Sequence, residues 1–590
     1  MSRLNREIMV GSVHHYHFVS TVKRRFVPAF LHLFIAVMIL KGVDMMKQSK
    51  LFMSTKQQRK NTQTMNAEQL LIAGCFIREV GEGIYSFLPL GIKLFDKIQK
   101  IIHEKLEKER AIRFQSSLMQ AVGEGKEVQK GQFTVTDQYD RQYLLSNALS
   151  VVVAPFLATQ LHVPGKGSSL YYQVTTEFEK VNKTACSLWN SREKTIFEMY
   201  GLELTDDEMI IVKELFSSLL STLHIQQYPI IESENEKEQT IRFIAVEPKG
   251  DVKLAYYSVG DYAQKIELAA AKQVYEHQED EPLPMEKVEL RDVETSEDIA
   301  EALDISLEQV LTTSLYEADG RLVVVVCRAD YEVSLAKLQK TLQATKVKKA
   351  SAKQVKELFS VEGLCIGPTQ LPVGTEVVAD YSVTSVINGI TGANEPSLFN
   401  QFVKPERDFA VHQYADLRYV QEGEEAPNGQ GVVQFANGID IGKSMNLFVA
   451  TDEEASIAIR YHRMDLTKMF AILASQHRDE LGFMWPKSLA PFDVHLLVEN
   501  EQNSAQYEAA QSLYALLRSY HYEVLYDDRE ISLEQKQLDA NLIGMPVQIV
   551  IDDDIEQRLL NVMMRKTAET STWQLEEVTE KLQSYFTMNE

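Results

Sequence analysis

The order of predicted elements near the C-terminus constrains the fold of this chain more than any other feature. Apolar, β-branched and aromatic residues dominate 492–498 and 522–526, as expected of buried strands. Between them, apolar residues recur at helical spacing across 507–517. A strand, a helix and a second strand in this order predict a small domain in which the helix packs on a sheet.

The rest of the chain adds further domains. Its 590 residues leave room for about three to five domains. Upstream patterns predict a capped helix from Asn66, an amphipathic helix at 94–106 and strands within 170–180, 241–257 and 322–327. The polar stretch 276–286 is acidic and carries two prolines, and 421–431 is rich in Gly, Glu, Pro and Asn, so we expect linkers or surface loops there.

Composition excludes several classes of protein. Acidic residues outnumber basic residues by 84 to 61, which gives a net charge of −23. A chain this acidic is not a general DNA coater or a basic membrane-surface protein, although a local basic patch could still hold RNA. The cysteines lack Cys-x-x-Cys spacing, so we expect reduced thiols and no metal site. They are Cys75, Cys186, Cys327 and Cys365.

The first 45 residues differ from the rest of the chain. Basic residues precede the apolar run 26–40, which is short for a membrane span of about 20 residues, although a signal-anchor is one interpretation. Residues 41–43 can be encoded by a purine-rich stretch typical of a bacterial ribosome-binding site. The codons of Met45 and Met46 come shortly after it. We therefore hypothesise that 1–45 is a mis-annotated extension, which the mass of the intact protein tests.

Four ordered segments carry a family resemblance. They are MKQSKL at 46–51, GIYSFLPLG at 83–91, QHRDE at 476–480 leading into WPKSLAPFDV at 485–494, and DDR at 527–529 followed by LIGMP at 542–546. In order and spacing they resemble bacterial-type prolyl-tRNA synthetase over essentially all of 46–590. The start of the resemblance at Met46 supports the extension hypothesis.

The resemblance implies an α+β protein. Its class II catalytic core is an antiparallel sheet flanked by helices, with an inserted editing-type α/β domain and a C-terminal α/β anticodon-binding domain. The expected parts are the extension 1–45, the core at 46–247 and 416–490, the insert at 248–415 and the C-terminal domain at 491–590. The family is usually dimeric and cytoplasmic. It uses ATP and Mg²⁺ to attach proline to tRNA, so the resemblance implies these partners, with no DNA and, without 1–45, no membrane.

The residues that meet ATP in the family are substituted here. A family strand ending in Phe-Arg-x-Glu presents arginine to the α-phosphate, and it aligns with 178–181. Glu179 therefore takes the arginine position and Val181 the glutamate position. Because charge develops on that phosphate, a cation is needed there. A unit-charge pair at 4 Å is worth about 4 kcal/mol at an effective dielectric of about 20, so this reversal predicts a rate loss of several powers of ten. Lys180 points to the other face if the strand continues, unless the register slips.

Two more nucleotide motifs are partly retained. The family's Arg-x-Arg-Glu-Phe falls on 190–194, where Arg192 and Glu193 survive as either a nucleotide contact or a surface ion pair. A Gly-rich strand-to-helix turn ending in arginine falls on 463–468, where the glycines that admit ATP are gone. Lys468 keeps the charge of that arginine without its planar guanidinium.

The resemblance places proline recognition on altered residues as well. The family's Thr-x-Glu falls on 148–150, which puts Ala148 and Ser150 at those two positions and removes the carboxylate for the substrate ammonium. Arg242 replaces an acid in a second motif. Ser117 replaces a proline that bears on dimer geometry.

The two outer domains have lost charged positions too. The lysine that anchors the tRNA end for editing aligns with Thr312, and a family histidine aligns with Phe399. The retained anticodon-domain residues are Asp527, Asp528 and Arg529. The acidic stretch 530–534 replaces a basic one, which predicts weaker tRNA binding.

Apolar and turn positions thus match the family while charged site positions do not. Selection for a folded protein without ligase chemistry leaves this pattern. One interpretation is a degenerate paralogue that binds or regulates without activating proline, with weakened ATP and Mg²⁺ binding. The alternative is a working proline–tRNA ligase with atypical motifs.

Overall fold

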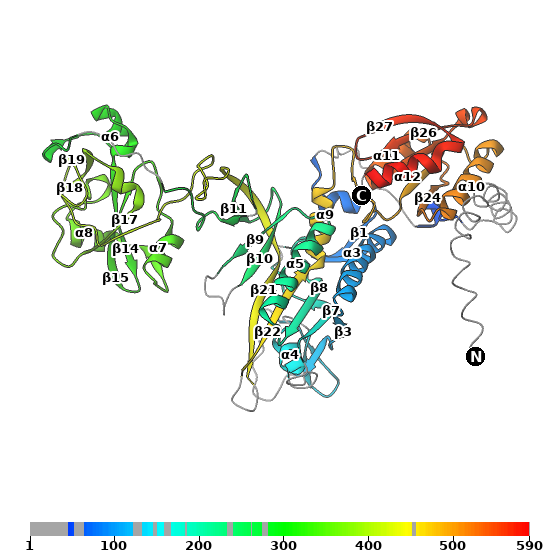
Figure 1. Cartoon of the computed structure of the whole chain (residues 1–590), viewed down its shortest axis with the longest axis horizontal. Helices are drawn as coiled ribbons and strands as arrows, with labels where there is room; N and C mark the ends of the chain where they lie inside the picture. Colours follow the sequence, from blue (N-terminus) through cyan, green and yellow to red (C-terminus); the bar gives the residue numbers. More distant parts are fainter. Residues whose placement is uncertain are drawn as a thin grey trace, which may run out of the picture. The chain divides into compact units, whose positions relative to one another are not determined.

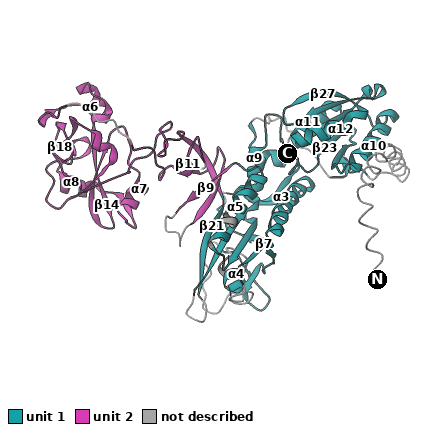
Figure 2. Cartoon of the chain, viewed as in Figure 1, with its two compact units in different colours: residues 1–226, 441–590 teal, residues 227–440 magenta. Residues whose placement is uncertain are grey.

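The computed structural model describes residues 45–51, 64–121, 132–145, 150–158, 167–182, 186–232, 240–260, 262–273, 281–450 and 456–588. The chain forms two compact units, 1–226 with 441–590, and 227–440 (Figure 2). Residues 1–44 of the hypothesised extension and Ala148 lie outside the described residues.

The first unit is built on an antiparallel sheet. In order, its strands are the second half of β21 (Val433–Ala450), β22 (Ser456–Asp465), β8 (Glu193–Leu202) and β7 (Ser169–Phe178), with the short β3 (Ile112–Arg113) parallel to β7 at the edge. The register pairs Phe178 with Glu193 and Ile196 with Asp465. Figure 1 shows α3 (Pro89–Lys108) and α5 (Asp206–Thr222) beside this sheet.

The two faces of this sheet differ because side chains alternate along a strand. On one face, Phe197 and His462 meet Phe216 of α5 at ring-centroid distances of 6.4 and 5.1 Å. The opposite face is apolar near one end and carries charged side chains toward the other. These charged side chains form the candidate site.

Smaller elements complete the core. The helices are α2 (Ala67–Ala73), α4 (Ser150–Phe156) and α9 (Leu466–Gln476). The strands are β1 (Ile77–Gly81), β2 (Ile84–Phe87), β4 (Met119–Ala121), β5 (Thr134–Thr136) and β6 (Gln142–Leu145). As the sequence predicted, Asn66 and Gln69 form a reciprocal capping box at the start of α2.

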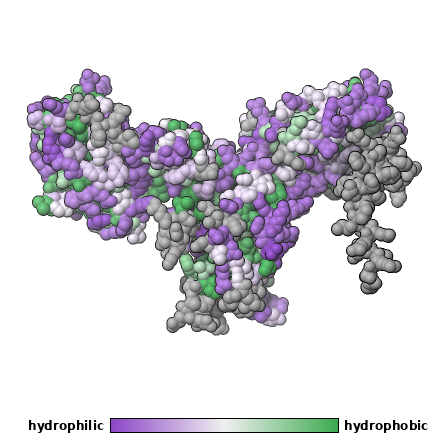
Figure 3. Space-filling view, in the orientation of Figure 1, coloured by the Kyte–Doolittle hydropathy of each residue, from purple (hydrophilic) through white to green (hydrophobic). Residues whose placement is uncertain are grey.

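A second sheet of the first unit forms the C-terminal domain. Its strand order is β24 (Val524–Asp527), β23 (Val494–Val498), β25 (Val547–Ile551), β26 (Leu559–Met564) and β27 (Glu569–Gln574). The helices are α10 (Ser504–Ser519), α11 (Leu533–Ile543) and α12 (Val578–Met588). β23, α10 and β24 confirm the predicted strand–helix–strand order, with the two strands parallel. Hydrophilic residues cover most of the visible surface of this domain (Figure 3).

The second unit holds the insert. One sheet has the order β16 (Val347–Lys349), β14 (Leu311–Ala318), β15 (Arg321–Arg328), β17 (Glu376–Asp380) and β20 (Gln413–Ala415), and another has β13 (Glu286–Glu289), β19 (Leu398–Val403) and β18 (Gly389–Glu395). Its helices are α6 (Ser296–Leu303), α7 (Leu335–Thr341) and α8 (Ala352–Phe359). The strands β9 (Gln227–Ile231), β10 (Ile241–Val246), β11 (Val252–Tyr257) and β12 (Ala263–Lys265) accompany the first half of β21.

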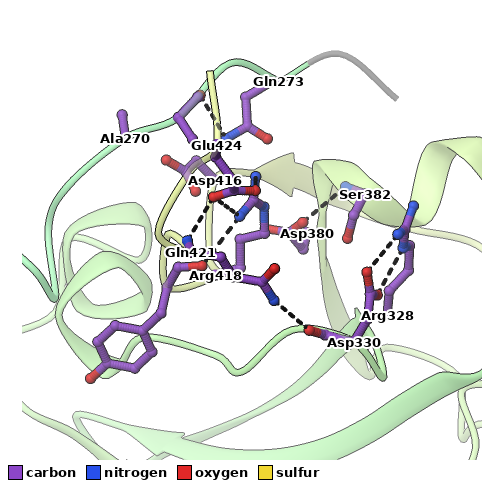
Figure 4. A network of polar contacts seen from close by, with 12 residues as sticks. Ala270, Gln273, Arg328, Asp330, Asp380, Ser382, Asp416, Arg418, Gln421 and Glu424 are labelled. Carbon is purple, nitrogen blue, oxygen red and sulfur yellow. Dashed lines mark hydrogen bonds and ion pairs between the residues drawn. The ribbon is translucent and has the colours of Figure 1, made fainter. Parts of the chain in front are cut away.

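Ion pairs of buried charged residues hold the segment 416–424 of this unit in place (Figure 4). The guanidinium of Arg418, which is only 1% exposed, donates to the Glu424 carboxylate at 3.0 and 2.8 Å and lies 4.0 Å from the Tyr331 ring centroid. Lys337 donates to both oxygens of Asp416 at 2.9 and 3.0 Å. Each buried cation therefore has a carboxylate partner, as burial of charge requires.

Candidate functional site

The candidate site is a run of polar side chains on the face of the core sheet opposite α5. Consecutive register partners place alternate residues of three strands on this face. From β7 these are Gln173, Thr175 and Glu177; from β8, Lys194, Ile196 and Glu198; and from β22, Tyr461, Arg463 and Asp465. Most of them are buried, so their interactions decide what else the face can hold.

The Glu198 carboxylate is the central acceptor of a buried hydrogen-bond network. Its carboxylate is fully buried and accepts from the Gln173 amide at 2.7 Å and from the Tyr461 hydroxyl at 2.7 Å. Burial raises the pKa of Glu198, and these two donors oppose that rise. Both oxygens therefore already have partners within the protein.

Arg463 lies in an ion pair across the sheet. Its guanidinium donates to Glu177 at 2.5 Å, and Glu177 is 5% exposed. Burial alone would lower the pKa of Arg463, but the facing Glu177 carboxylate raises it above its ordinary value. This arginine is therefore charged and neutralised by a carboxylate two strands away in the same sheet.

Lys194 forms the second ion pair of this face. Its ammonium is buried and contacts the carboxylate of Glu179, whose side chain is half-exposed. Glu179 follows the last residue of β7, and its backbone N–H donates to the Arg192 carbonyl at 2.8 Å. The strand thus delivers an acid beside the buried lysine.

Asp465 is the last residue of this face, at the point where β22 leads into α9. Its carboxylate is 3% exposed and accepts the backbone N–H of Lys468 at 2.9 Å, which caps the helix. Burial raises the pKa of Asp465, and Lys468 and Lys194 oppose the rise. The side chains of Arg463 and Asp465 thus stand where the strand meets the helix.

Comparisons with known proteins identify the parts of the chain. Residues 291–398 match the family described as aminoacyl-tRNA editing domain, and 493–585 match the anticodon binding domain. A proline–tRNA ligase of Lysinibacillus sphaericus is 32% identical over 569 residues, covering 92% of this chain and all of that one. The chain belongs to the prolyl-tRNA synthetase family.

Two further proteins of this family are similar to the chain over most of its length. A proline–tRNA ligase of Bacillus mycoides is 29% identical over 561 residues, covering 90% of this chain and 98% of that one. The prolyl-tRNA synthetase of Cryptosporidium parvum, solved with L-proline and AMP, has a TM-score of 0.50 at 11% identity, covering 89% of this chain and 75% of that one. The fold is that of a class II synthetase with an inserted editing domain and a C-terminal anticodon-binding domain, as the resemblance implied.

The synthetase positions predicted to meet ATP lie close together. Glu179 and Val181 follow β7, Arg192 directly precedes β8, and Glu193 is the first residue of β8. The Arg192 side chain donates to the Glu82 carbonyl at 2.9 Å. β7 ends at Phe178, so the strand alternation invoked for Lys180 stops before it, and the Lys180 ammonium lies 5.6 Å from the Phe133 ring centroid. Lys468 is in the first turn of α9.

Of the positions predicted to recognise proline, the structure describes Ser150 and Arg242. Ser150 begins α4. Arg242 lies in the second unit, where it pairs with Glu232 at 2.8 Å and Asp440 at 2.6 Å. The Ser117 hydroxyl donates to the Met119 carbonyl at 2.9 Å.

The two predicted editing positions lie at one cavity of the second unit. Thr312 and Phe399 both line a space of about 590 Å³. The Thr312 hydroxyl donates to the Cys327 carbonyl at 3.1 Å, and Phe399 is buried. The fold therefore brings these two predicted positions, which are 87 residues apart in the sequence, to the same cavity.

The predicted anticodon-domain residues hold the domain together. Arg529 bridges Asp527 at 2.7 Å and Asp539 at 2.7 Å. Burial raises the pKa of Asp527, but Arg529 and other nearby cations bring it below its ordinary value. Asp528 accepts the backbone N–H and hydroxyl of Ser49 at 3.0 and 2.6 Å.

Sequence reasoning missed Glu177, Lys194 and Glu198. Charged residues at alternate positions of an otherwise apolar strand were a usable signal, because such positions share one face. Among the described residues, no group of three or more His, Cys, Asp or Glu side chains could hold a metal ion. None of the described helices is long and apolar enough to cross a membrane.

Proposed function

We propose that this prolyl-tRNA synthetase family member does not activate proline and acts as a binding or regulatory paralogue. One observation carries the proposal. The two cations of the candidate face, the buried Lys194 and the partly buried Arg463, are each held by a carboxylate of the same face, Glu179 and Glu177. Catalysis of adenylate formation needs preorganised positive charge directed at the phosphate, and here that charge is already neutralised.

The family's ATP and Mg²⁺ do not fit these side chains. The glycines that admit the nucleotide are gone from 463–468, and the side chains of Arg463 and Asp465 in this stretch are engaged in the fold. A triphosphate beside Glu179 would face an acid at the position where the family has arginine. Charge repulsion and lost space therefore both support the proposal.

Proline-dependent exchange of pyrophosphate into ATP tests this proposal. We expect the full chain to give exchange at least about a thousand-fold below an active relative, since about 4 kcal/mol of lost charge stabilisation corresponds to that factor. The Lysinibacillus sphaericus proline–tRNA ligase, prepared identically, is the control. Exchange within ten-fold of that control would show a working ligase with atypical motifs.

Weakened tRNA binding is a second part of the proposal. Asp527, Asp528 and Arg529 are engaged within the protein, and the acidic stretch 530–534 follows them. RNA affinity depends on neutralised phosphates. In filter binding with tRNA at low salt, we expect at least about a hundred-fold weaker affinity than for the same relative. Equal affinity with equal salt dependence would remove this part of the proposal.

The proposed assembly is a homodimer that acts in the cytoplasm. Several large apolar side chains around β3 to β5 are exposed in the single chain, as a subunit interface would leave them. They are Ile112, Leu118, Met119 and Val135. Light scattering that gives the mass of one chain would contradict the dimer.

A further inference from the structure

Residues 45–51 lie along the edge strand β24 of the C-terminal domain. The Met46 carbonyl accepts the backbone N–H of Tyr526 at 3.0 Å, and the residue after Met46 forms a parallel β-bridge with Tyr526. The Met46 N–H donates to the Tyr514 hydroxyl at 3.0 Å. The side chain of Met45 is 5% exposed and belongs to the core of this domain. The edge of the sheet therefore holds an extended segment by its backbone, as exposed sheet edges do with peptides.

The domain also recognises the side chains of this segment. The Lys47 ammonium lies 3.0 Å from the Glu501 carboxylate and 3.6 Å from that of Asp528. Gln48 is fully buried, and its side-chain oxygen lies 2.7 Å from Nε2 of His495. Burial lowers the pKa of His495 to about 4, so this ring is neutral near pH 7. The contacts with Lys47 and Gln48 make the docking specific for sequence.

The fit of the segment is incomplete. Nε2 of Gln48 and Nδ1 of His495 are buried, and neither has a hydrogen-bond partner among the described residues. Buried polar atoms without partners are costly. A peptide that satisfied both atoms would therefore compete with residues 45–51 for this edge.

Charge decides which kind of competitor fits. Without Lys47, the carboxylates of Glu501 and Asp528 would lose the ammonium that they share. The acidic stretch 530–534 follows Asp528 closely in the sequence. RNA phosphates would be repelled by these acids. An extended peptide with a lysine would restore both the ion pairs and the bonds to the sheet edge.

We propose that the edge of β24 is a docking site for an extended, lysine-bearing segment of a partner protein, which residues 45–51 fill as an intramolecular competitor. Five residues form this docking site, namely His495, Glu501, Tyr514, Tyr526 and Asp528. Such docking gives the proposed binding or regulatory role a kind of partner. It does not depend on the loss of proline activation, so pyrophosphate exchange and peptide binding can succeed or fail separately.

A fluorescent peptide with the sequence of residues 45–51, acetylated and amidated at its ends, tests the proposal on the full chain. Lys47→Glu sets an acid against the two carboxylates and should release the intramolecular segment. By fluorescence anisotropy, we expect saturable peptide binding to Lys47→Glu, at least about ten-fold tighter than to wild type, because more docking sites are open. Lys353→Glu makes the same charge change on a side chain of the second unit that is 85% exposed, so it is the matched control and should bind as wild type does.

Two results on these variants would overturn the proposal: no saturable binding to Lys47→Glu, or equal binding by Lys47→Glu and wild type. A peptide with glutamate in place of its lysine at position 47 should bind Lys47→Glu at least about ten-fold more weakly, and equal affinity would also overturn it. Ser49→Ala removes only the hydroxyl bond to Asp528, so it should raise peptide affinity about three- to ten-fold. It decides the matter if Lys47→Glu misfolds, and an unchanged affinity would then overturn the proposal.

Competition identifies the class of partner. We expect that neither tRNA nor the unlabelled wild-type chain displaces the peptide from Lys47→Glu. Displacement by tRNA would show that RNA occupies the docking site, and displacement by the wild-type chain would show that a second copy does. Either displacement would overturn the assignment to a segment of a partner protein.

Discussion

Asp479→Ala is expected to lower the free energy of unfolding by about 3 kcal/mol, because it strips the partner from a buried charge. Arg565 is fully buried, and its two terminal nitrogens donate to the Asp479 carboxylate at 2.7 and 2.5 Å. The same carboxylate accepts the backbone N–H groups of Leu481 and Gly482, so its loss also weakens this turn.

Urea unfolding followed by tryptophan fluorescence measures this loss. Trp485 lies a few residues from the turn and donates to the Ile543 carbonyl at 3.0 Å, so its emission reports on this region. Glu508→Ala, at an exposed position of the same unit, is the control and should change stability by less than about 0.5 kcal/mol. A loss no larger than that of the control would show that the pair contributes little.

The contribution of Asp479 should also depend on pH. Burial raises the pKa of Asp479, but the Arg565 bond and the turn amides lower it below its ordinary value. A group with a depressed folded pKa stabilises fully above its unfolded pKa of about 3.9 and loses that contribution as the pH falls through the folded value. The difference between wild type and Asp479→Ala should therefore be constant near neutrality and shrink in acid.

Glu179→Arg is expected to destabilise the fold by about 1–3 kcal/mol, although it restores the family residue. It would set a second cation beside Lys194, whose ammonium is buried against Glu179. The lower end of the range applies if solvent screens the half-exposed position 179. The family has phenylalanine where this chain has Lys194, so Glu179→Arg with Lys194→Phe should recover most of the loss.

A double-mutant cycle in urea measures this coupling. The matched control combines Glu179→Arg with Lys180→Ala, which removes the neighbouring exposed lysine and should not rescue stability. Rescue by Lys180→Ala, or a Glu179→Arg variant as stable as wild type, would show that the pair with Lys194 does not matter. Selective rescue by Lys194→Phe would show that the two substitutions act as one unit.

Local patterns predicted the elements well because periodicity and capping are local properties. The helix expected at 94–106 is α3 (Pro89–Lys108), and the strand expected within 170–180 is β7. The region 241–257 contains two strands, β10 and β11, because Pro248 and Gly250 stand at the turn between them. The run 322–327 lies within the buried strand β15.

The interactions of the candidate site could not be predicted from one sequence. Glu177 and Arg463 are 286 residues apart, and only the sheet register brings them together. The resemblance located Glu179 as a reversed charge, but it could not show that Lys194 lies against it. Which cations are neutralised depends on pairing between distant residues, and only the structure shows that pairing.

Direct titration of the full chain with ATP and Mg²⁺ tests the central claim, that the cations of the core face are already occupied. We expect no saturable binding up to about 1 mM ATP, the concentration at which a site worth about 4 kcal/mol would half-fill. Binding with micromolar affinity that disappears in Arg463→Ala would contradict the claim, because it would show that this face holds a triphosphate after all.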